Sequence, residues 1–148
     1  MTPHSLSDAE RALLAAAVDT MLPGAADWPG AASLDLAGEA ESLAALSLAG
    51  LVPLRRLLAA LPAGFAELDA DAREAALAAL QTTDPEAFGA TLQAAYNAYY
   101  TDERVLAVVA AKTGYRPGSP QPDGHELEPF DESMIAVART REPLWRKA

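Results

Sequence analysis

The chain has 148 residues and a formal net charge of −10, a length sufficient for one domain with a hydrophobic core. Its hydrophobic fraction of 51% is rich in alanine and poor in β-branched residues, so the predicted class is all-α. The acidic charge argues against binding to nucleic acid or to anionic lipid. The absence of cysteine excludes disulfides, thiolate metal sites, iron–sulfur clusters and covalently attached c-type haem.

The first predicted helix begins after Ser7, because the run from Ser7 to Glu10 has the form of a capping box. Pro23 ends this helix, whose apolar face comprises Leu13, Leu14, Ala17, Val18 and Met21. A loop containing Trp28-Pro29-Gly30 follows. The second predicted helix covers Leu34 to about Leu48, with an apolar face of Leu36, Ala40, Leu43 and Leu46.

Pro53 is acceptable in a first helical turn, so a third helix is predicted there, with Leu54, Leu57, Leu58 and Leu61 on its apolar face. After the turn at Pro62-Ala63-Gly64, Asp69 is expected to cap a fourth helix. The apolar residues of this helix are Ala75, Ala76, Leu77, Ala79 and Leu80.

Asp84-Pro85-Glu86 is a strong helix start, since it combines a capping carboxylate, a first-turn proline and an acid near the positive end of the helix dipole. The fifth predicted helix carries a broad stripe of Phe88, Leu92, Ala95, Tyr96, Tyr99 and Tyr100. Thr101 is expected to cap a sixth helix that stops before Gly114, and Asp131 to cap a last short one.

These elements predict a compact orthogonal bundle of six or seven short helices over residues 1–113. Residues 114–148 are expected to form an extended Pro-rich tail with a short helix that packs on the bundle or on a partner. A flexible linker is the alternative for the proline-rich run. An ordered tail is favoured because disordered segments normally lack apolar anchors such as Tyr115, Leu127, Phe130 and Trp145.

Basic residues gather at the end of the chain, namely Arg139, Arg141, Arg146 and Lys147. They are consistent with docking on an acidic partner, with folding back on the acidic bundle, and with a solvated terminus.

The tyrosine cluster at the end of the fifth helix has two interpretations. Helical spacing favours a core stripe, in which buried hydroxyls need polar partners such as Asn97, Asp102 or Arg104. The functional interpretation is a rim of amphipathic rings that face a partner. Acid–base catalysis by this cluster is disfavoured, because the sequence indicates neither a substrate pocket nor a perturbing environment.

The sequence lacks the residues that other common catalytic and metal sites require. The histidines are His4 and His125, too few for a di-iron bundle or a His-rich zinc site, and no phosphate-binding glycine loop is present. The run Asp123-Gly124-His125-Glu126 could bind a metal weakly, but a solvated turn is favoured. No metal, cofactor or catalytic residue is therefore assigned to this chain. No export signal or membrane span is visible, which predicts a cytoplasmic protein unless a leader was removed or the chain is exported with a companion.

Several runs carry a resemblance to a known family. They are Leu22-Pro23, the Trp28-Pro29-Gly30-Ala31 loop, the Leu68-Asp69-Ala70-Asp71-Ala72-Arg73 helix start and, above all, the run from Ala98 to Leu106 that includes Tyr99-Tyr100-Thr101-Asp102. From about Leu6 to the Gly-Tyr-Arg-Pro turn at 114–117, and again in its tail, the chain resembles the small (gamma) subunits of gluconate 2-dehydrogenase.

This resemblance implies a non-catalytic accessory subunit, all-α in fold, that stabilises or matures a large subunit of the glucose–methanol–choline type. That large subunit holds FAD and oxidises a sugar or alcohol, and a cytochrome subunit often accepts the electrons. Exported members carry a twin-arginine leader that is not visible here, which favours a cytoplasmic complex.

We expect the partner interface to consist mainly of aromatic anchors, since such residues carry most interface energy. The alternative function is a stand-alone helical module that binds a small apolar ligand. The residues expected to contact the partner are Trp28, Tyr96, Tyr99, Tyr100, Asp102, Tyr115, Phe130 and Trp145.

Overall fold

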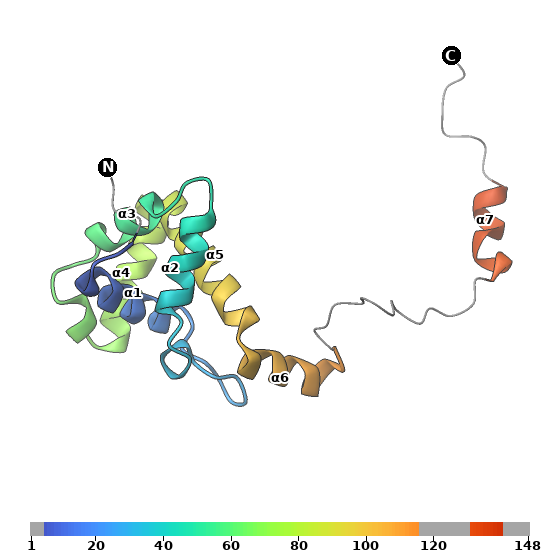
Figure 1. Cartoon of the computed structure of the whole chain (residues 1–148), viewed down its shortest axis with the longest axis horizontal. Coiled ribbons are helices and arrows are strands. Elements are labelled where there is room, and N and C mark those ends of the chain that lie inside the picture. The colour runs from blue at the N-terminus through green and yellow to red at the C-terminus, as the bar shows by residue number, and fades with distance from the viewer. Residues whose placement is uncertain (1–4, 116–130, 141–148) are drawn as a thin grey trace, which may run out of the picture. The chain divides into compact units, whose positions relative to one another are not determined.

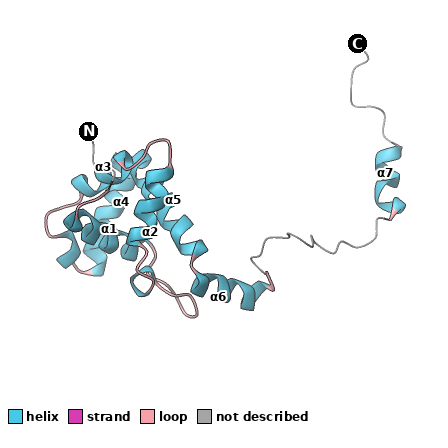
Figure 2. Cartoon of the chain, in the orientation of Figure 1, coloured by secondary structure: helices cyan, strands magenta, loops and turns pink. Residues whose placement is uncertain are grey.

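The computed structural model describes residues 5–115 and 131–140 (Figure 1). The chain divides into two units, Met1–Arg116 and Pro117–Ala148, and each is described by itself. The described residues are helical or in loops and contain no strand, although Ala25 and Trp28 form an isolated β-bridge (Figure 2). The prediction of an all-α fold is confirmed.

Six α-helices and two short 3-10 helices make up the described part of the first unit. In chain order they are α1 Asp8–Met21, η1 Ala31–Ser33, α2 Ala37–Leu46, α3 Val52–Ala60, η2 Phe65–Glu67, α4 Ala70–Thr83, α5 Pro85–Thr101 and α6 Glu103–Thr113. The described part of the second unit contains η3 Glu132–Ile135 and α7 Ala136–Arg139.

The helix starts follow the capping signals in the sequence. Both halves of the Ser7 capping box are present, with the Ser7 hydroxyl accepting from the Glu10 amide and the Glu10 carboxylate from the Ser7 amide. Asp69 and Asp84 accept from backbone amides in the first turns of α4 and α5. Asp131 caps η3 in the same way.

The predicted cap of α6 was wrong by one residue. Asp102 is the N-cap, and its carboxylate accepts from the Arg104 amide at 2.8 Å. Thr101 still belongs to α5, where its hydroxyl donates to the carbonyl of Asn97. The threonine hydroxyl is thus used inside the preceding helix, and the ionised carboxylate, a stronger acceptor, caps the next one.

Helix α5 is the centre of the first unit and packs against α1, α2, α3, α4 and α6. Its buried residues are small except for one ring, and comprise Ala87, Thr91, Ala94, Ala95, Ala98 and Tyr99. Alanines at these positions let neighbouring helices approach closely. The largest fully buried side chains elsewhere in the core are Phe65, Leu14, Leu54, Leu57, Val18 and Val105.

Three predicted apolar faces are only partly buried. In α2 the buried positions include Ala37, Ala40 and Ala44. Leu46 follows Ala44 by two residues, which places it about 200° further around the helix, and its side chain is 85% exposed. In α4, Leu77 is buried whereas Ala75 and Ala79 are exposed. In α5 the buried face is rotated, so that one edge of the predicted aromatic stripe reaches solvent.

Candidate interaction surface

Tyr99 belongs to the core of the bundle. The residue is 6% exposed, and its hydroxyl donates to the carbonyl oxygen of Pro29 at 2.9 Å. Burial, with a smaller contribution from Tyr100, raises the pKa of the Tyr99 phenol, so the hydroxyl stays protonated and able to donate at neutral pH. The structure therefore places this candidate contact residue inside the chain, where the partner of its hydroxyl is a carbonyl 70 residues away.

Tyr96 and Tyr100 lie on the outer side of α5. They are 40% and 52% exposed, with ring centroids 6.2 Å apart. The ring of Tyr100 also meets that of Tyr99 edge-on at 5.2 Å, a favourable aromatic geometry. The buried ring of Tyr99 thus supports Tyr100, which in turn lies beside Tyr96.

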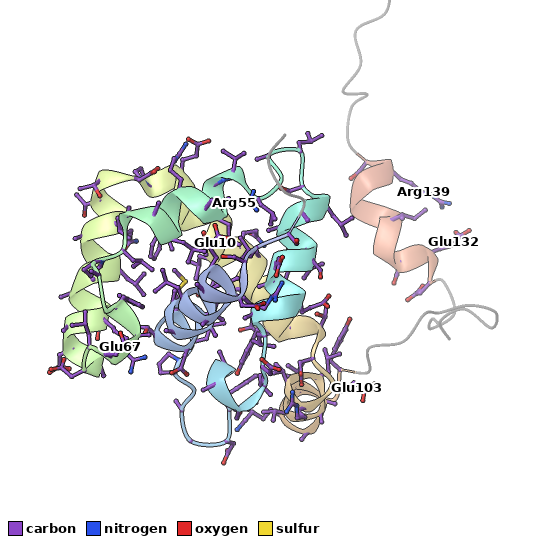
Figure 3. All side chains as sticks on the ribbon, turned by 60° about the vertical axis from the view of Figure 1, so that its left-hand side comes forward. Glu10, Arg55, Glu67, Glu103, Glu132 and Arg139 are labelled. Carbon is purple, nitrogen blue, oxygen red and sulfur yellow. The ribbon has the colours of Figure 1, made fainter. Side chains whose placement is uncertain are left out.

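These tyrosines continue an uncharged surface along α5, which we call the outer face. All its residues are exposed and none is charged: Gly89, Ala90, Gln93, Tyr96, Asn97 and Tyr100. Gln93 donates to the side-chain oxygen of Asn97 at 2.9 Å, so the polar members are arranged along the helix. The exposed residues of α4 from Ala75 to Thr83 are also uncharged, so the feature that distinguishes the outer face is its two exposed tyrosines. Charged side chains such as Glu67 and Glu103 are exposed elsewhere on the bundle (Figure 3).

Asp102 and Arg104 fix the corner between α5 and α6. Arg104 pairs with Asp102 at 2.8 Å and donates to the carbonyls of Ser33 at 2.9 Å and Leu34 at 3.1 Å. Hydrogen bonds from Arg104 lower the pKa of Asp102, although burial opposes this shift. Asp102, a predicted contact residue, is therefore committed within the chain to capping and to this ion pair.

Trp28 lies in the loop between α1 and η1 and is partly buried against the core. The loop is closed by paired backbone bonds between Ala25 and Trp28. It is also tight: a Cβ on Gly24, whose φ is +77°, would lie 2.5 Å from the Gly30 nitrogen. Because the Trp28 side chain helps to fill the bundle, a part of its ring surface at most is open to a partner.

The remaining predicted contact residues lie toward the C-terminus. Tyr115 follows α6 and is 59% exposed. Phe130 and Trp145 lie outside the described residues. Of the predicted set, the structure brings Tyr96, Tyr99 and Tyr100 together, and of these three Tyr96 and Tyr100 are exposed.

A groove beside the outer face was not predicted from the sequence. It has a volume of about 280 Å³ and lies between the end of α2, the α2–α3 loop and α5. Its wall is formed by Leu43, Ala44, Ser47, Ala49, Gly50, Pro53, Leu54, Ala90, Gln93, Ala94 and Asn97. No charged side chain lines it, and Ala90, Gln93 and Asn97 also belong to the outer face.

Exposed aliphatic residues occur in the helix end and loop that border this groove. Leu46 is 85% exposed, Leu48 is fully exposed and Val52 is 57% exposed. None of the three lines the groove, and single exposed apolar residues are ordinary on protein surfaces. The signal in the sequence was the apolar run from Leu46 to Val52, which extends past the end of the helical pattern.

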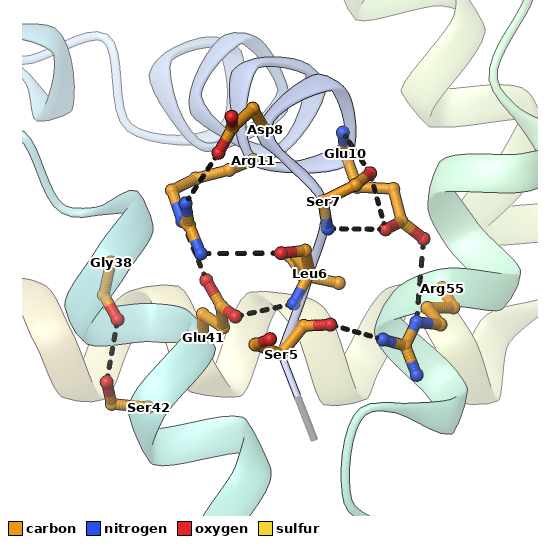
Figure 4. A network of polar contacts seen from close by, with 10 residues as sticks. All are labelled: Ser5, Leu6, Ser7, Asp8, Glu10, Arg11, Gly38, Glu41, Ser42 and Arg55. Atoms are coloured by element: carbon orange, nitrogen blue, oxygen red, sulfur yellow. Dashed lines mark hydrogen bonds and ion pairs between the residues drawn. The ribbon is translucent and has the colours of Figure 1, made fainter. Parts of the chain in front are cut away.

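The most buried ion pair anchors the N-terminal segment (Figure 4). The carboxylate of Glu41, on α2, accepts from the Leu6 amide at 2.6 Å and from Arg11 Nε at 2.9 Å. Burial alone would raise the pKa of Glu41, but these hydrogen bonds outweigh it and the pKa is lowered. Glu41 therefore stays ionised at neutral pH and has the properties of a structural anchor. Beside it, Arg55 donates to the Ser5 carbonyl and pairs with Glu10.

Within residues 5–115 and 131–140, no group of three or more metal-ligating side chains is brought together. No helix in these described ranges is long and apolar enough to cross a membrane. The weak metal site considered at Asp123–Glu126 lies outside them.

Comparisons with known proteins gave no relative. No protein-family model, no curated protein and no solved structure matches the chain. The resemblance to gluconate 2-dehydrogenase small subunits remains a prediction from the sequence.

Proposed function

We propose that this chain is a non-catalytic accessory subunit that binds and stabilises the large subunit of an FAD-dependent sugar or alcohol dehydrogenase. The observation that carries the proposal is the uncharged outer face of α5, on which Tyr96 and Tyr100 are half-exposed in a chain with a net charge of −10. Tyrosine is enriched at protein interfaces, where charged residues are depleted. The class of partner comes from the resemblance of the run Ala98–Leu106 to the small-subunit family.

The mechanism is stabilisation by binding. A companion that binds the folded large subunit, and not its unfolded chain, raises the free energy of unfolding of that subunit by RT ln(1 + [L]/Kd), where [L] is the concentration of free companion. The gain is about 2.7 kcal/mol when [L] is a hundred times Kd. Tyr96 and Tyr100 suit this role because Tyr100 packs edge-on against the buried Tyr99 and Tyr96 lies beside Tyr100, so docking orders few side chains. FAD belongs to the partner in this proposal, and a cytochrome subunit is a possible third component.

Co-expression tests the proposal. The chain is produced with a glucose–methanol–choline-type dehydrogenase subunit encoded in the same genome, and copurification, bound flavin and the thermal midpoint of the flavoprotein are measured. We expect a complex in which the flavoprotein retains more FAD and melts at a higher temperature. A flavoprotein that is equally stable and flavin-loaded without the chain, and that does not copurify with it, would refute the accessory role. Fractionation of the same cells tests the expected cytoplasmic location.

The alternative function, binding of a small apolar ligand, is favoured by the groove. Its volume of about 280 Å³ is at the lower limit of ligand pockets, which usually enclose roughly 300–1,000 Å³. An open groove of this size suits one side chain better than a whole ligand. Native mass spectrometry of the purified chain distinguishes the two, since a ligand-binding module would carry an additional small mass.

A further inference from the structure

We infer that Ser5 and Leu6 form a strap that opens and closes independently of the helix bundle, and that the carboxylate of Glu41 holds this strap closed. The inference goes beyond the proposed function, because it concerns the isolated chain and does not depend on a partner. It gives the buried ion pair of Glu41 a conformational role, in which one ionisable side chain controls the segment that leads into α1.

Charged side chains from three helices hold the backbone of the strap (Figure 4). Glu41 of α2 accepts from the Leu6 amide at 2.6 Å, and Arg11 of α1 donates to the Leu6 carbonyl at 3.4 Å. Arg55 of α3 donates to the Ser5 carbonyl at 2.6 Å. Within residues 5–115, no backbone–backbone hydrogen bond includes Ser5 or Leu6. The strap can therefore be released by these side chains without breaking a helix.

A single apolar side chain adds to this attachment. Leu6 is 5% exposed and belongs to the hydrophobic core, whereas Ser5 and Ser7 on either side of it are exposed. Segments with few buried apolar contacts open locally, with free energies below that of global unfolding. Withdrawal of one leucine from the core is therefore a smaller event than the unfolding of the bundle.

The opening is bounded at Ser7. The Ser7 amide and hydroxyl donate to the Glu10 carboxylate at 2.7 and 2.8 Å, and the Ser7 carbonyl accepts from the Arg11 amide at 2.9 Å. These bonds lie within the first turn of α1 and include no atom of the strap. Helix α1 can therefore keep its capping box when the strap opens.

Glu41 controls the strap because its carboxylate acts on it twice. It binds the Leu6 amide directly, and it accepts from Arg11 Nε at 2.9 Å, which holds Arg11 where it reaches the Leu6 carbonyl. Burial raises the pKa of Glu41, but the hydrogen bonds from Arg11 and Leu6 outweigh it and lower the pKa. Opening breaks the bond to Leu6, so the open state binds a proton on Glu41 more tightly than the closed state. Acidification through the closed-state pKa therefore favours opening.

Other charged groups near Glu41 do not replace this control. Those on α1 and α3 are Asp8, Glu10, Arg11 and Arg55. Both arginines stay charged at acidic pH. The pKa of Glu10 is also lowered, mainly by the hydrogen bond from the Ser7 amide, but Glu10 makes no bond to the strap. Helix α5 packs against α2 as well, and its one charged residue, Glu86, pairs with Arg56.

Hydrogen exchange of the full chain, followed by NMR at low urea concentrations, tests whether the strap opens separately. The amide of Leu6 is compared with that of Ala95, which is fully buried in α5. A local opening exposes little surface, so exchange at Leu6 should depend weakly on urea, whereas exchange at Ala95 should follow global unfolding. Tyr99→Phe, which weakens the bundle outside the strap, should lower the protection of Ala95 about fivefold and leave that of Leu6 within about twofold.

A pair of variants tests control by Glu41. Glu41→Gln keeps an acceptor oxygen but removes the charge, and should lower the protection of Leu6 about tenfold at neutral pH. The matched control, Glu10→Gln, removes the other carboxylate of the network and should leave it within about threefold. Between about pH 6 and pH 4, after correction for intrinsic exchange, the protection of Leu6 should fall in the original chain and in Glu10→Gln but stay level in Glu41→Gln.

Two kinds of result overturn the inference. If Leu6 responds to urea as Ala95 does, the strap belongs to the cooperative unit of the bundle; this measurement needs no variant, so it decides the question even if a variant does not fold. If Glu41→Gln leaves the protection of Leu6 unchanged, or Glu10→Gln lowers it equally, Glu41 does not control the strap. Neither result bears on the accessory function, because no partner is present in the experiment.

Discussion

Replacement of Tyr99 by phenylalanine separates its structural role from the roles of its exposed neighbours. The substitution keeps the buried ring and removes the hydroxyl that donates to the Pro29 carbonyl at 2.9 Å. A hydrogen bond of this kind contributes about 0.5–1.5 kcal/mol net, and its loss leaves the Pro29 oxygen without this donor. We therefore expect Tyr99→Phe to lower the free energy of unfolding by about 1 kcal/mol.

Removal of the ring has a larger effect. Tyr99 is 6% exposed and supports Tyr100 at a centroid distance of 5.2 Å. Truncation of a buried aromatic residue to alanine typically costs about 3–5 kcal/mol, so Tyr99→Ala is expected in that range. Tyr100 is 52% exposed, and Tyr100→Phe is expected to change stability by less than about 0.5 kcal/mol.

The assay is urea denaturation of the full chain followed by far-ultraviolet circular dichroism. Unchanged m-values are needed so that a shift in midpoint reports stability alone. The reasoning fails if Tyr99→Ala destabilises the chain no more than Tyr100→Ala. The binding assay should give the reverse order, with Tyr100→Ala weakening attachment to the flavoprotein and Tyr99→Phe leaving it almost unchanged.

Two further predictions concern the polar anchors. The pKa of Glu41 is lowered in the folded chain from an ordinary value of 4.5. The ionised carboxylate therefore stabilises the fold fully above about pH 4.5, and this stabilisation is lost as the pH falls through the folded pKa. Glu41→Gln should reduce the loss of stability below about pH 4.5, as measured by acid titration followed by circular dichroism. Arg104→Lys should lower the thermal midpoint, because an ammonium group lacks the planar guanidinium fork that reaches Ser33, Leu34 and Asp102 together. The control Arg139→Lys should leave the midpoint unchanged, because the ion pair of Arg139 with Glu132 is exposed.

Local signals in the sequence predicted the helix starts well. The caps at Ser7, Asp69 and Asp84 depend on hydrogen bonds that span three residues, so the residues that decide them are adjacent in the sequence. Two starts were wrong. At Thr101 two capping residues follow one another, and the threonine hydroxyl bonds inside α5 while Asp102 caps α6. Helix α2 was predicted from Leu34 but begins at Ala37, and its N-cap, Leu36, has no side-chain hydrogen bond that could mark the start in the sequence.

The orientation of the helices was less predictable because alanine is common on several faces. Periodicity identifies a face by the contrast between large apolar and polar residues, and α5 has alanine at 87, 90, 94, 95 and 98. The aromatic stripe therefore seemed to mark the buried side. In the structure four of these alanines, at 87, 94, 95 and 98, are buried against neighbouring helices, whereas Ala90, Tyr96 and Tyr100 reach solvent.

Contacts between distant segments were beyond the sequence. The bond from Tyr99 to Pro29 and those from Arg104 to Ser33 and Leu34 join residues about 70 apart along the chain. No local sequence pattern predicts such a contact. The groove is of the same kind, since its two sides come from residues 43–54 and 90–97 and become neighbours only through helix packing.

The open groove implies that the isolated chain is not at its stability maximum. Ala90 borders unfilled apolar space, so Ala90→Leu should bury additional aliphatic surface and, if its side chain enters the groove, raise the free energy of unfolding by about 1 kcal/mol. Ala90 also belongs to the outer face, so under the proposed function the same substitution should weaken binding to the flavoprotein. Ala75→Leu on α4 adds the same group at an exposed site and should change neither quantity appreciably. A stabilised variant that binds as well as the original chain would show that the partner's contact does not include Ala90, because a larger side chain inside an interface cannot be added without changing the partner's attachment.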